Sequence, residues 1–303
     1  MQKEFYERLI DIMGQESVLI DEPMEKHTTF RIGGPSDYFV LPKNIEEIQG
    51  VLTLCKEQNV PFYILGNGSN LLVSDTGFRG VMIHLGKYMN KIEVEGTCIR
   101  AQVGALLSKI AGEALRQELT GFEFASGIPG TLGGAVMMNA GAYGGEMKDV
   151  LEEVTALTPD GEVLILKKEE LDLGYRTSVI GKKGYIALEA VIRLEKGNPE
   201  EIRATMDDLT ERRTTKQPLE YPSAGSTFKR PEGYFAGKLI QDAGLRGFTV
   251  GGAQISEKHC GFVINKNHAT ARDVVELMRE VSDRVEAKFG VPLEPEVKKL
   301  GDF

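Results

Sequence analysis

The sequence predicts a fold that mixes α-helices and β-strands and is built from two or three domains. Length is the first observation, because 303 residues correspond to two or three units at roughly 100–200 residues per domain. Composition is the second, because 41% apolar and 27% charged residues are typical of soluble globular proteins. The third is that segments with helical and strand periodicity alternate along the chain. These observations argue against a disordered, fibrous or coiled-coil protein.

The expected elements follow from these periodicities in chain order. Apolar residues at helical spacing predict helices at residues 1–14, 45–58, 105–117, 198–213 and 270–289. Thr270 provides an N-cap for the last helix. Short apolar runs bounded by turns predict strands at residues 61–65, 71–74, 81–85, 91–96, 97–103, 150–159, 162–168, 185–196 and 291–297. Soft boundaries near residues 90 and 197 then divide the chain into segments 1–90, 91–197 and 198–303.

Charge and cysteine content restrict the classes of partner. The formal net charge of −9 disfavours a broad basic surface for nucleic acid or anionic lipid, so an anionic ligand needs a local cluster of cations. No run approaches the roughly 18 apolar residues of a membrane span, and the first residues lack the apolar core of a signal peptide. We therefore expect a cytoplasmic protein without membrane contact. Cys55, Cys98 and Cys260 are odd in number and widely spaced, which argues against a disulfide framework or a zinc site.

A glycine-rich stretch at residues 121–145 is the most informative part of the sequence. It contains eight glycines, and its single charged residue is Glu123. Because glycine lets backbone N–H groups approach phosphate oxygens, the stretch suits a nucleotide cofactor, with Asn139 and Tyr143 as polar contacts. A set of tight turns explains the composition equally well. Residues 64–73 form a second glycine turn, but Leu71 stands where GxGxxG requires its third glycine, so this is not a Rossmann fingerprint.

Three polar residues elsewhere are candidates for chemistry. Ser226 follows Gly225 in a loop of small residues but lacks the following glycine of a nucleophile elbow, which disfavours a hydrolase. Arg176, in GYRTS, can clamp a carboxylate or form a surface salt bridge. Glu296, in LEPEV, is either a buried carboxyl group with a raised pKa or a solvated one. The residues alone leave these alternatives open.

Taken together and in order, the motifs resemble the UDP-N-acetylenolpyruvoylglucosamine reductase (MurB) family. The matching segments are TTFRIGG at 28–34, ILGNGSNLLV at 64–73, SGIPGTLGGAVMMNAGAYGGE at 126–146, GYRTS at 174–178, RRTTKQP at 212–218, AGSTFKRP at 224–231 and LEPEV at 293–297. The resemblance implies an α+β protein with an FAD-binding region of the vanillyl-alcohol oxidase type. That region would comprise subdomains 1–90 and 91–197, followed by a smaller α+β substrate domain at 198–303, whose last strand returns Glu296 to the active site.

The resemblance also implies roles for particular residues. Arg176, Ser226 and Glu296 match the family's catalytic positions. Non-covalent FAD would be held by Gly66, Asn67, Gly68, Ser69, Asn70, Gly127, Ile128, Pro129, Gly130, Gly133, Gly134, Asn139, Gly141, Ala142, Tyr143 and Arg213. Substrate contacts would come from Tyr175, Lys216, Lys229 and Arg230, with Lys238 completing a local positive patch.

Departures from the family pattern limit this transfer. Lys298 stands where arginine is usual, and Arg230 where some relatives have asparagine. The segment between Ser178 and Arg213 is too short for a tyrosine-bearing insertion, so the chain resembles the shorter class of the family.

The reaction implied by the resemblance is reduction of the enolpyruvyl ether of UDP-N-acetylglucosamine to UDP-N-acetylmuramate in peptidoglycan precursor synthesis. NADPH would supply hydride through FAD, and Ser226 would then protonate the substrate. We expect a monomer. Two alternatives are an FAD oxidase or dehydrogenase acting on an alcohol, for which no base is obvious at the flavin, and a non-catalytic sugar-nucleotide binding protein, against which the retained Arg, Ser and Glu argue.

Overall fold

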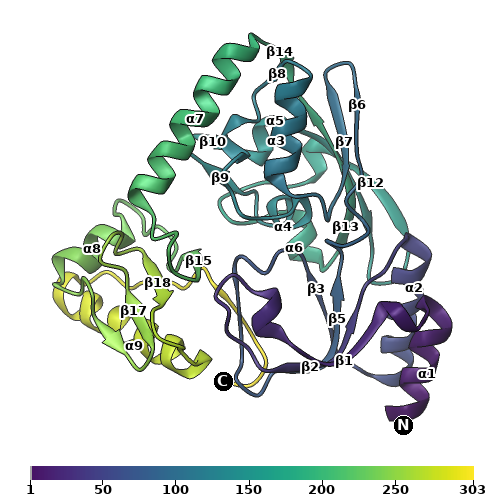
Figure 1. Cartoon of the computed structure of the whole chain (residues 1–303), viewed down its shortest axis with the longest axis horizontal. Helices are drawn as coiled ribbons and strands as arrows, with labels where there is room; N and C mark the ends of the chain where they lie inside the picture. Colours follow the sequence, from purple (N-terminus) through teal and green to yellow (C-terminus); the bar gives the residue numbers. More distant parts are fainter. Residues whose placement is uncertain (1) are drawn as a thin grey trace. The chain divides into compact units, whose positions relative to one another are not determined.

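The computed structural model describes residues 2–303, and helices and strands are mixed throughout this range (Figure 1). Contacts divide the chain into two compact units. Unit 1 contains the chain up to Leu19 together with Tyr38–Asn67 and Gly80–Arg212. Unit 2 contains Ile20–Asp37, Gly68–Arg79 and Arg213–Phe303. Each unit has its own cluster of buried apolar side chains.

An antiparallel sheet of five strands forms much of unit 1. Its order is β12-β11-β13-β7-β6, and its strands are β6 (Ile92–Glu95), β7 (Cys98–Gln102), β11 (Leu151–Leu157), β12 (Val163–Lys167) and β13 (Ile186–Arg193). The central strand β13 is buried over most of its length, as expected for a strand covered on both faces. Between β6 and β7, Gly96 has a φ of 62° in a two-residue turn, a conformation that glycine adopts without strain.

The rest of unit 1 consists of helices and of a second sheet, some of whose strands also contain residues of unit 2. The second sheet has the order β1-β2-β5-β3, with β1 at Val18–Pro23, β2 at Pro35–Val40, β3 at Phe62–Leu65 and β5 at Phe78–His84. The longer helices are α1 (Gln2–Met13), α2 (Ile45–Gln58), α3 (Leu107–Arg116) and α7 (Pro199–Lys216). Shorter elements are η1 (Gln15–Ser17), η3 (Glu123–Ala125), α4 (Leu132–Met137), β8 (Leu119–Thr120), β9 (Gly141–Ala142), β10 (Gly145–Glu146), α5 (Met147–Val150), η4 (Lys168–Glu170), α6 (Val179–Lys183) and β14 (Glu195–Lys196).

Helix α4 packs against β7 and β13 of unit 1. A Cβ at Gly133 would lie 2.9 Å from Cβ of Val103, so glycine allows this close approach of the helix to the end of β7. The sequence did not predict α4, because two glycines in six residues disfavour a helix and only tertiary packing stabilises it.

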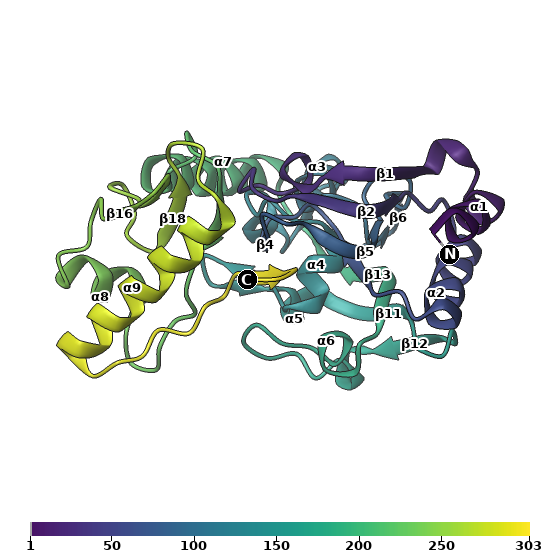
Figure 2. The same ribbon diagram turned by 90° about the horizontal axis from the view of Figure 1, so that it is seen from below.

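Unit 2 is built around a four-stranded sheet and a long helix. The sheet has the order β15-β18-β17-β16, with β15 at Ser223–Ser226, β16 at Thr249–Val250, β17 at Ala253–Ile255 and β18 at Phe262–Asn265. Helix α9 (Ala271–Phe289) packs against β16 and β17 (Figure 2). The remaining elements are η2 (Met24–His27), β4 (Leu71–Val73), α8 (Ala236–Asp242) and β19 (Lys298–Leu300), the last of which pairs in parallel with β4.

The N-terminus of α9 is held by two carboxylates. Thr270 Oγ1 accepts a hydrogen bond from Asp273 N (3.1 Å), and Asp273 Oδ2 accepts from Thr270 N (3.0 Å), which confirms the predicted cap. Asp75 accepts from the amides of Ala271 and Arg272 at 2.7 and 3.1 Å. Because these amides lack partners within the helix, Asp75 fixes the loop after β4 to the start of α9.

The expected elements are largely confirmed, with one error near the C-terminus. All five predicted helices are present, and the strands expected between residues 61 and 196 are found. The strand expected at residues 291–297 is wrong, because the last strand is β19 and the preceding segment is irregular apart from a bridge between Pro295 and Phe228. Prolines at 292 and 295 have no N–H to donate to a sheet ladder, which explains the difference.

The division into units differs from three consecutive segments. The pieces Ile20–Asp37 and Gly68–Arg79 belong with the C-terminal part of the chain, and the last change of unit follows Arg212. The predicted boundary at residue 197 stays a prediction. The subdivision of the N-terminal two thirds at residue 90 stays a prediction. Within residues 2–303, no helix is both long and apolar enough to cross a membrane.

Candidate functional site

Two glycine-rich loops lie against each other in unit 1. The first contains residues 66–67, and the second is the loop before α4. Asn67 Nδ2 donates a hydrogen bond to the carbonyl oxygen of Pro129 (2.8 Å). A Cβ at Gly66 would lie 2.4 Å from Oγ1 of Thr131, so glycine lets the loops approach this closely. The Gly130 carbonyl accepts from the amide of Leu107, which ties the second loop to α3. The structure therefore brings residues 66–67 together with the loop before α4.

The charge and the space around these loops are compatible with the sequence-based prediction that they hold a diphosphate. The carboxylate of Glu123 accepts hydrogen bonds from Thr120 Oγ1 (2.7 Å) and from the amide of Gly121 (2.8 Å), so it is already engaged. The rest of the stretch to residue 145 has no charged side chain. Apart from its chain neighbours and the backbone of α4 itself, the nearest atom to a Cβ at Gly134 would be Thr131 Oγ1 at 3.9 Å, so space beside the first turn of α4 is open. Glycine backbone around open space without a carboxylate fits the diphosphate of FAD.

The remainder of the first glycine-rich loop, residues 68–70, belongs to unit 2. Gly68 has a φ of 60°, and a Cβ there would lie 2.0 Å from the carbonyl oxygen of His27, so no other residue fits. Asn70 Nδ2 donates to the Glu296 carbonyl (3.2 Å), and the Asn70 carbonyl accepts from Lys298 N (3.0 Å). The segment predicted to hold FAD therefore also supports the segment that carries Glu296.

The C-terminal end of α4 places Asn139 at its last turn. Ala140 N donates to Ala135 O (2.9 Å) and Asn139 N to Val136 O (3.4 Å), the two bonds of a Schellman motif. Asn139 has a φ of 44° and is 2% exposed. Its Nδ2 donates to Glu146 Oε2 (2.8 Å) and to the Gly174 carbonyl (3.2 Å), and its Oδ1 accepts from Lys148 N (2.8 Å). The amide is thus engaged by the protein itself.

Arg176 lies at the tip of a tight turn. The backbones of Gly174 and Thr177 exchange hydrogen bonds of 3.1 and 3.2 Å, which leaves Tyr175 and Arg176 as the two turn residues. Arg176 has a φ of 55°, a strained conformation for a residue with a Cβ. Ser178, which is fully buried, donates through Oγ to the Met137 carbonyl (2.7 Å). Both sides of the turn are therefore fixed to the end of α4.

Glu146 carries negative charge beside this turn. A hydrogen bond from Lys148 lowers the pKa of Glu146, and the bond from Asn139 and the charge of Arg176 act in the same direction, against the effect of burial. The Lys148 Nζ atom lies 3.0 Å from Glu146 Oε2. Glu146 is therefore ionised at neutral pH, and the positive charge of Arg176 favours that state.

The hairpin of β9 and β10 carries other predicted cofactor contacts. Gly141 and Ala142 pair with Glu146 and Gly145, and Tyr143 lies in the turn with a φ of 54°. The Tyr143 side chain is 46% exposed. A ring at this position is thus presented to solvent on a short, hydrogen-bonded hairpin.

An irregularity at the end of β15 sets the orientation of the Ser226 side chain. Its pairing with β18 shifts between Ser223 and Ser226, and Gly225 between them has a φ of 74°. A bulge of this kind turns the following side chain, and Ser226 is exposed while Thr227 is buried. Thr227 Oγ1 accepts from Val263 N (2.9 Å), which satisfies an amide at the edge of the irregular pairing.

Glu296 lies on the irregular segment that runs beside Ser226 and Thr227. The amide of Glu296 donates to the Thr227 carbonyl (2.8 Å), and the amide of Lys229 donates to the Glu294 carbonyl (2.8 Å). The Glu296 side chain is largely buried, at 8% exposure for the residue. Unit 2 therefore brings the Ser226 and Glu296 segments together, whereas Arg176 belongs to unit 1.

The cations predicted to form a local patch are partly neutralised. Lys229 pairs with Glu294, and Lys238 pairs with Asp242 at 2.6 Å. Arg230 stacks on the ring of Phe235, with its guanidinium carbon 3.9 Å from the ring centroid. Lys216 is exposed near the end of α7, where Arg213 donates to Gln217 Oε1 (3.1 Å).

Two residues with clear structural roles were not singled out from the sequence. Glu146 closes the glycine-rich stretch, and its position as the first charged residue after Glu123 was the available signal. Thr227 directly follows Ser226, but nothing in the sequence indicates that its hydroxyl accepts from Val263 in β18 while its carbonyl accepts from Glu296 in the irregular C-terminal segment.

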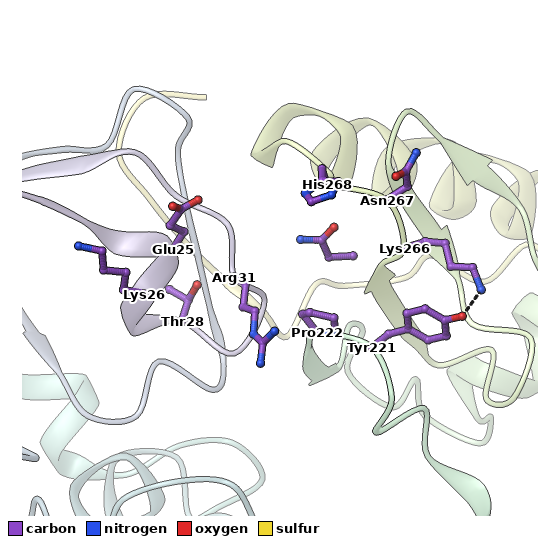
Figure 3. Close-up of a pocket in the computed structure, with 10 residues that line it drawn as sticks. Glu25, Lys26, Thr28, Arg31, Tyr221, Pro222, Lys266, Asn267 and His268 are labelled. Carbon is purple, nitrogen blue, oxygen red and sulfur yellow. Dashed lines mark hydrogen bonds between the residues drawn. The ribbon is translucent and has the colours of Figure 1, made fainter.

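A polar cavity of about 610 Å³ lies elsewhere in unit 2 (Figure 3). The stretch from Glu25 to Arg31 forms one wall, and Tyr221 with residues 266–268 forms the other. Lys266 Nζ donates to the Tyr221 hydroxyl (2.5 Å) and lies 4.0 Å from the centre of its ring. The predicted catalytic residues are not among the residues that line this cavity.

Two family models match the chain. Residues 36–167 match an FAD binding domain, and residues 217–300 match the C-terminal domain of UDP-N-acetylenolpyruvoylglucosamine reductase. The reductase of that name from Clostridioides difficile (strain 630) is 54% identical over 300 residues, which cover 99% of each chain. The one from Alkaliphilus metalliredigens (strain QYMF) is 52% identical over the full length of both chains.

Solved structures agree with these matches. The crystal structure of UDP-N-acetylenolpyruvylglucosamine reductase (MurB) from Thermus caldophilus has a TM-score of 0.80 and 36% identity, covering 94% of this chain and 98% of that chain. A 4-ethylphenol oxidase from Gulosibacter chungangensis has a TM-score of 0.52 at 14% identity, covering 97% of this chain and 64% of its own, and shares the fold alone. The predicted α+β fold with an FAD-binding region is confirmed.

Proposed function

The chain belongs to the UDP-N-acetylenolpyruvoylglucosamine reductase family, and on that basis we propose that it reduces the enolpyruvyl ether of UDP-N-acetylglucosamine to UDP-N-acetylmuramate, with NADPH as the reductant. Its FAD-binding domain and its relatives make it an FAD-dependent oxidoreductase. In this proposal it acts in peptidoglycan precursor synthesis, as a cytoplasmic monomer. The observation that carries the proposal is the hydrogen-bonded junction of the Ser226 and Glu296 segments at Thr227.

FAD would be held by the glycine-rich loops. Backbone groups of residues 66–70 and 127–134 would surround the diphosphate, because these loops combine close approach with an absence of negative charge. Gly141, Ala142 and Tyr143 on the β9–β10 hairpin and Arg213 at the end of α7 would add further contacts. When bound, FAD supplies hydride transfer from NADPH to the methylene carbon of the substrate.

Arg176 and Glu296 would stabilise the charge that hydride addition creates. Hydride arriving at the methylene carbon leaves an electron pair on the adjacent carbon, which bears the carboxylate, and that charge spreads onto the carboxylate oxygens. Arg176 offers charge-assisted hydrogen bonds, and Glu296, if protonated in its largely buried position, offers one more. A preorganised donor of this kind typically contributes about 3–4 kcal/mol to the transition state.

Ser226 would complete the reduction by donating a proton. Its hydroxyl is exposed, and it has no side-chain hydrogen bond within residues 2–303, so it is available to a ligand. Proton transfer from Oγ to the carbon that bears the carboxylate closes the balance of one hydride and one proton. The exposed residues Tyr175, Lys216 and Arg230 and the half-buried Lys229 would contact the substrate, whose diphosphate requires cations in a protein of net charge −9.

Anaerobic visible spectroscopy of the FAD-loaded protein tests the proposal. We expect NADPH to bleach the flavin absorbance, and we expect the enolpyruvyl ether to restore it with formation of UDP-N-acetylmuramate, identified by mass spectrometry. A flavin that NADPH reduces but the enolpyruvyl ether does not reoxidise would contradict the assigned substrate. A flavin that NADPH fails to reduce would contradict the assigned reductant.

A further inference from the structure

We propose that Asn139 is a positioning residue for Arg176 and does not contact the cofactor, with Glu146 and Gly174 as its partners. This inference deepens the proposed function and rests on the role assigned there to Arg176. It replaces the sequence-based expectation that Asn139 binds FAD, because the side chain lies in a network within unit 1.

The backbone position of Asn139 is one that favours glycine. Asn139 occupies the left-handed residue of a Schellman motif at the end of α4, where glycine is the usual residue. The surrounding stretch uses glycine freely, so an asparagine at this place indicates that its side chain is needed. Asparagine is also among the few residues with a Cβ that tolerate this conformation well.

The side chain of Asn139 has no donor left for a ligand. An asparagine amide has two N–H donors and one carbonyl oxygen. Nδ2 donates to Glu146 Oε2 and to the Gly174 carbonyl, and Oδ1 accepts from Lys148 N. At 2% exposure, the group also has almost no surface to offer to FAD.

Hydrogen bonds from Asn139 and Ser178 fix the turn that carries Arg176 to α4. Gly174, whose carbonyl accepts from Asn139 Nδ2, is the first residue of the turn. Ser178 follows the turn, and its Oγ donates to the Met137 carbonyl of α4. Arg176 between them has a φ of 55°, a left-handed conformation that is strained for a residue with a Cβ. Strain of this kind persists only when surrounding contacts hold it, and the two anchors to α4 supply those contacts.

Helix α4 connects the Arg176 turn to the predicted flavin loop. The loop at residues 127–131 leads directly into α4, and the Arg176 turn is fixed to the other end of the same helix. The short helix α4 therefore sets the place of the guanidinium relative to the loop that would hold FAD. Misplacement of a catalytic group by about 1 Å can slow a reaction roughly 10²-fold.

Asn139→Gly is the variant that isolates this role. Glycine retains the left-handed backbone and the Schellman motif, while all three side-chain hydrogen bonds disappear. Asn59→Gly is the matched control, because Asn59 has a φ of 52° at the end of α2 and an exposed side chain. Ser178→Ala removes the second anchor while leaving Asn139 in place, and it keeps the test decisive if Asn139→Gly does not fold.

The first readout is independent of any activity. Trypsin cleaves after Arg176 only when the turn opens, so we expect cleavage of the Arg176–Thr177 bond to be several-fold faster in Asn139→Gly and Ser178→Ala than in the wild type and Asn59→Gly. The second readout uses FAD-loaded protein reduced with NADPH. We expect reoxidation by the enolpyruvyl ether to be about 10²-fold slower in Asn139→Gly, with FAD affinity and reduction by NADPH unchanged.

Several results would overturn the inference. Unchanged cleavage would show that Asn139 does not hold the turn, and weakened FAD binding with unchanged cleavage would make Asn139 a cofactor contact instead. Faster cleavage with unchanged reoxidation would remove the catalytic part of the claim. If wild-type flavin is not reoxidised by the enolpyruvyl ether, the proposed function fails, while the trypsin readout still decides whether Asn139 holds the turn.

Discussion

Replacing Thr227 by valine tests the junction between the two candidate catalytic segments. Thr227 is 1% exposed, and its Oγ1 accepts from Val263 N at 2.9 Å. Valine has nearly the same shape but no acceptor, so the buried Val263 amide loses its partner. Leaving such a group unsatisfied costs roughly 1–3 kcal/mol of folding free energy. The backbone bonds of Thr227 to Gly261 and Glu296 do not involve the side chain, so the fold itself should be retained.

Urea unfolding followed by far-UV circular dichroism measures this cost, since the chain has no tryptophan for fluorescence. We expect the midpoint for Thr227→Val to fall by an amount equivalent to about 1–3 kcal/mol, with an unchanged slope. Thr227→Ser is the control, because it keeps the hydroxyl and loses one methyl group, and it should remain closer to the wild type. Thr227→Val with wild-type stability, or Thr227→Ser with a larger loss than Thr227→Val, would refute the hydrogen-bond argument.

Three further variants test the site and the fold. Gly225→Ala places a Cβ in a left-handed conformation, so we expect a loss of about 1–2 kcal/mol in unfolding free energy and slower turnover, and unchanged values would exclude the bulge as the cause of the Ser226 orientation. Hydrogen bonds from the amides of Thr270 and Gly252 lower the pKa of Asp273, although burial alone would raise it. Its contribution to stability is therefore present above the pKa of the unfolded state, near 3.8, and is lost as the pH falls through the lower pKa of the folded state. Asp273→Asn should thus destabilise the protein by roughly 0.5–2 kcal/mol at pH 7 and flatten the acid side of a melting-temperature profile, whereas an identical profile would contradict the capping role. Glu146→Gln removes the charge beside Arg176 while keeping an acceptor for Asn139, and we expect its main effect in reoxidation by substrate; a selective loss of FAD binding would argue otherwise.

Periodicity and capping signals predicted the regular parts of the fold because they depend on local chemistry. The helix that begins after Thr270 has both an amphipathic repeat and a capping box, and its start is confirmed. The helix α4 and the strands of the unit 2 sheet are short and are stabilised by distant contacts, so local patterns could not reveal them. The segment at 291–297 has strand-like apolar residues, but its prolines prevent a regular ladder.

The candidate site shows the same limit at the level of single residues. Residue type and the family resemblance identified Ser226, Glu296 and Arg176 as candidates, and their catalytic roles stay predictions. The sequence could not show that the Asn139 side chain donates hydrogen bonds to Glu146 and Gly174, because these partners are 7 and 35 residues away along the chain. A polar residue in a glycine-rich stretch is an equally good candidate for a ligand contact and for a fixed turn, and only the hydrogen bonds distinguish the two.

The most direct test of the account is the rate at which the enolpyruvyl ether reoxidises the NADPH-reduced flavin in a single turnover of wild type and Ser226→Ala. Ser226 makes no side-chain hydrogen bond within residues 2–303, so the variant should fold and bind FAD as the wild type does. We predict reoxidation coupled to UDP-N-acetylmuramate in the wild type and a rate about 10²–10⁴-fold lower in the variant, as expected for loss of a general acid. Equal rates in the two proteins would contradict the role of Ser226 as the proton donor.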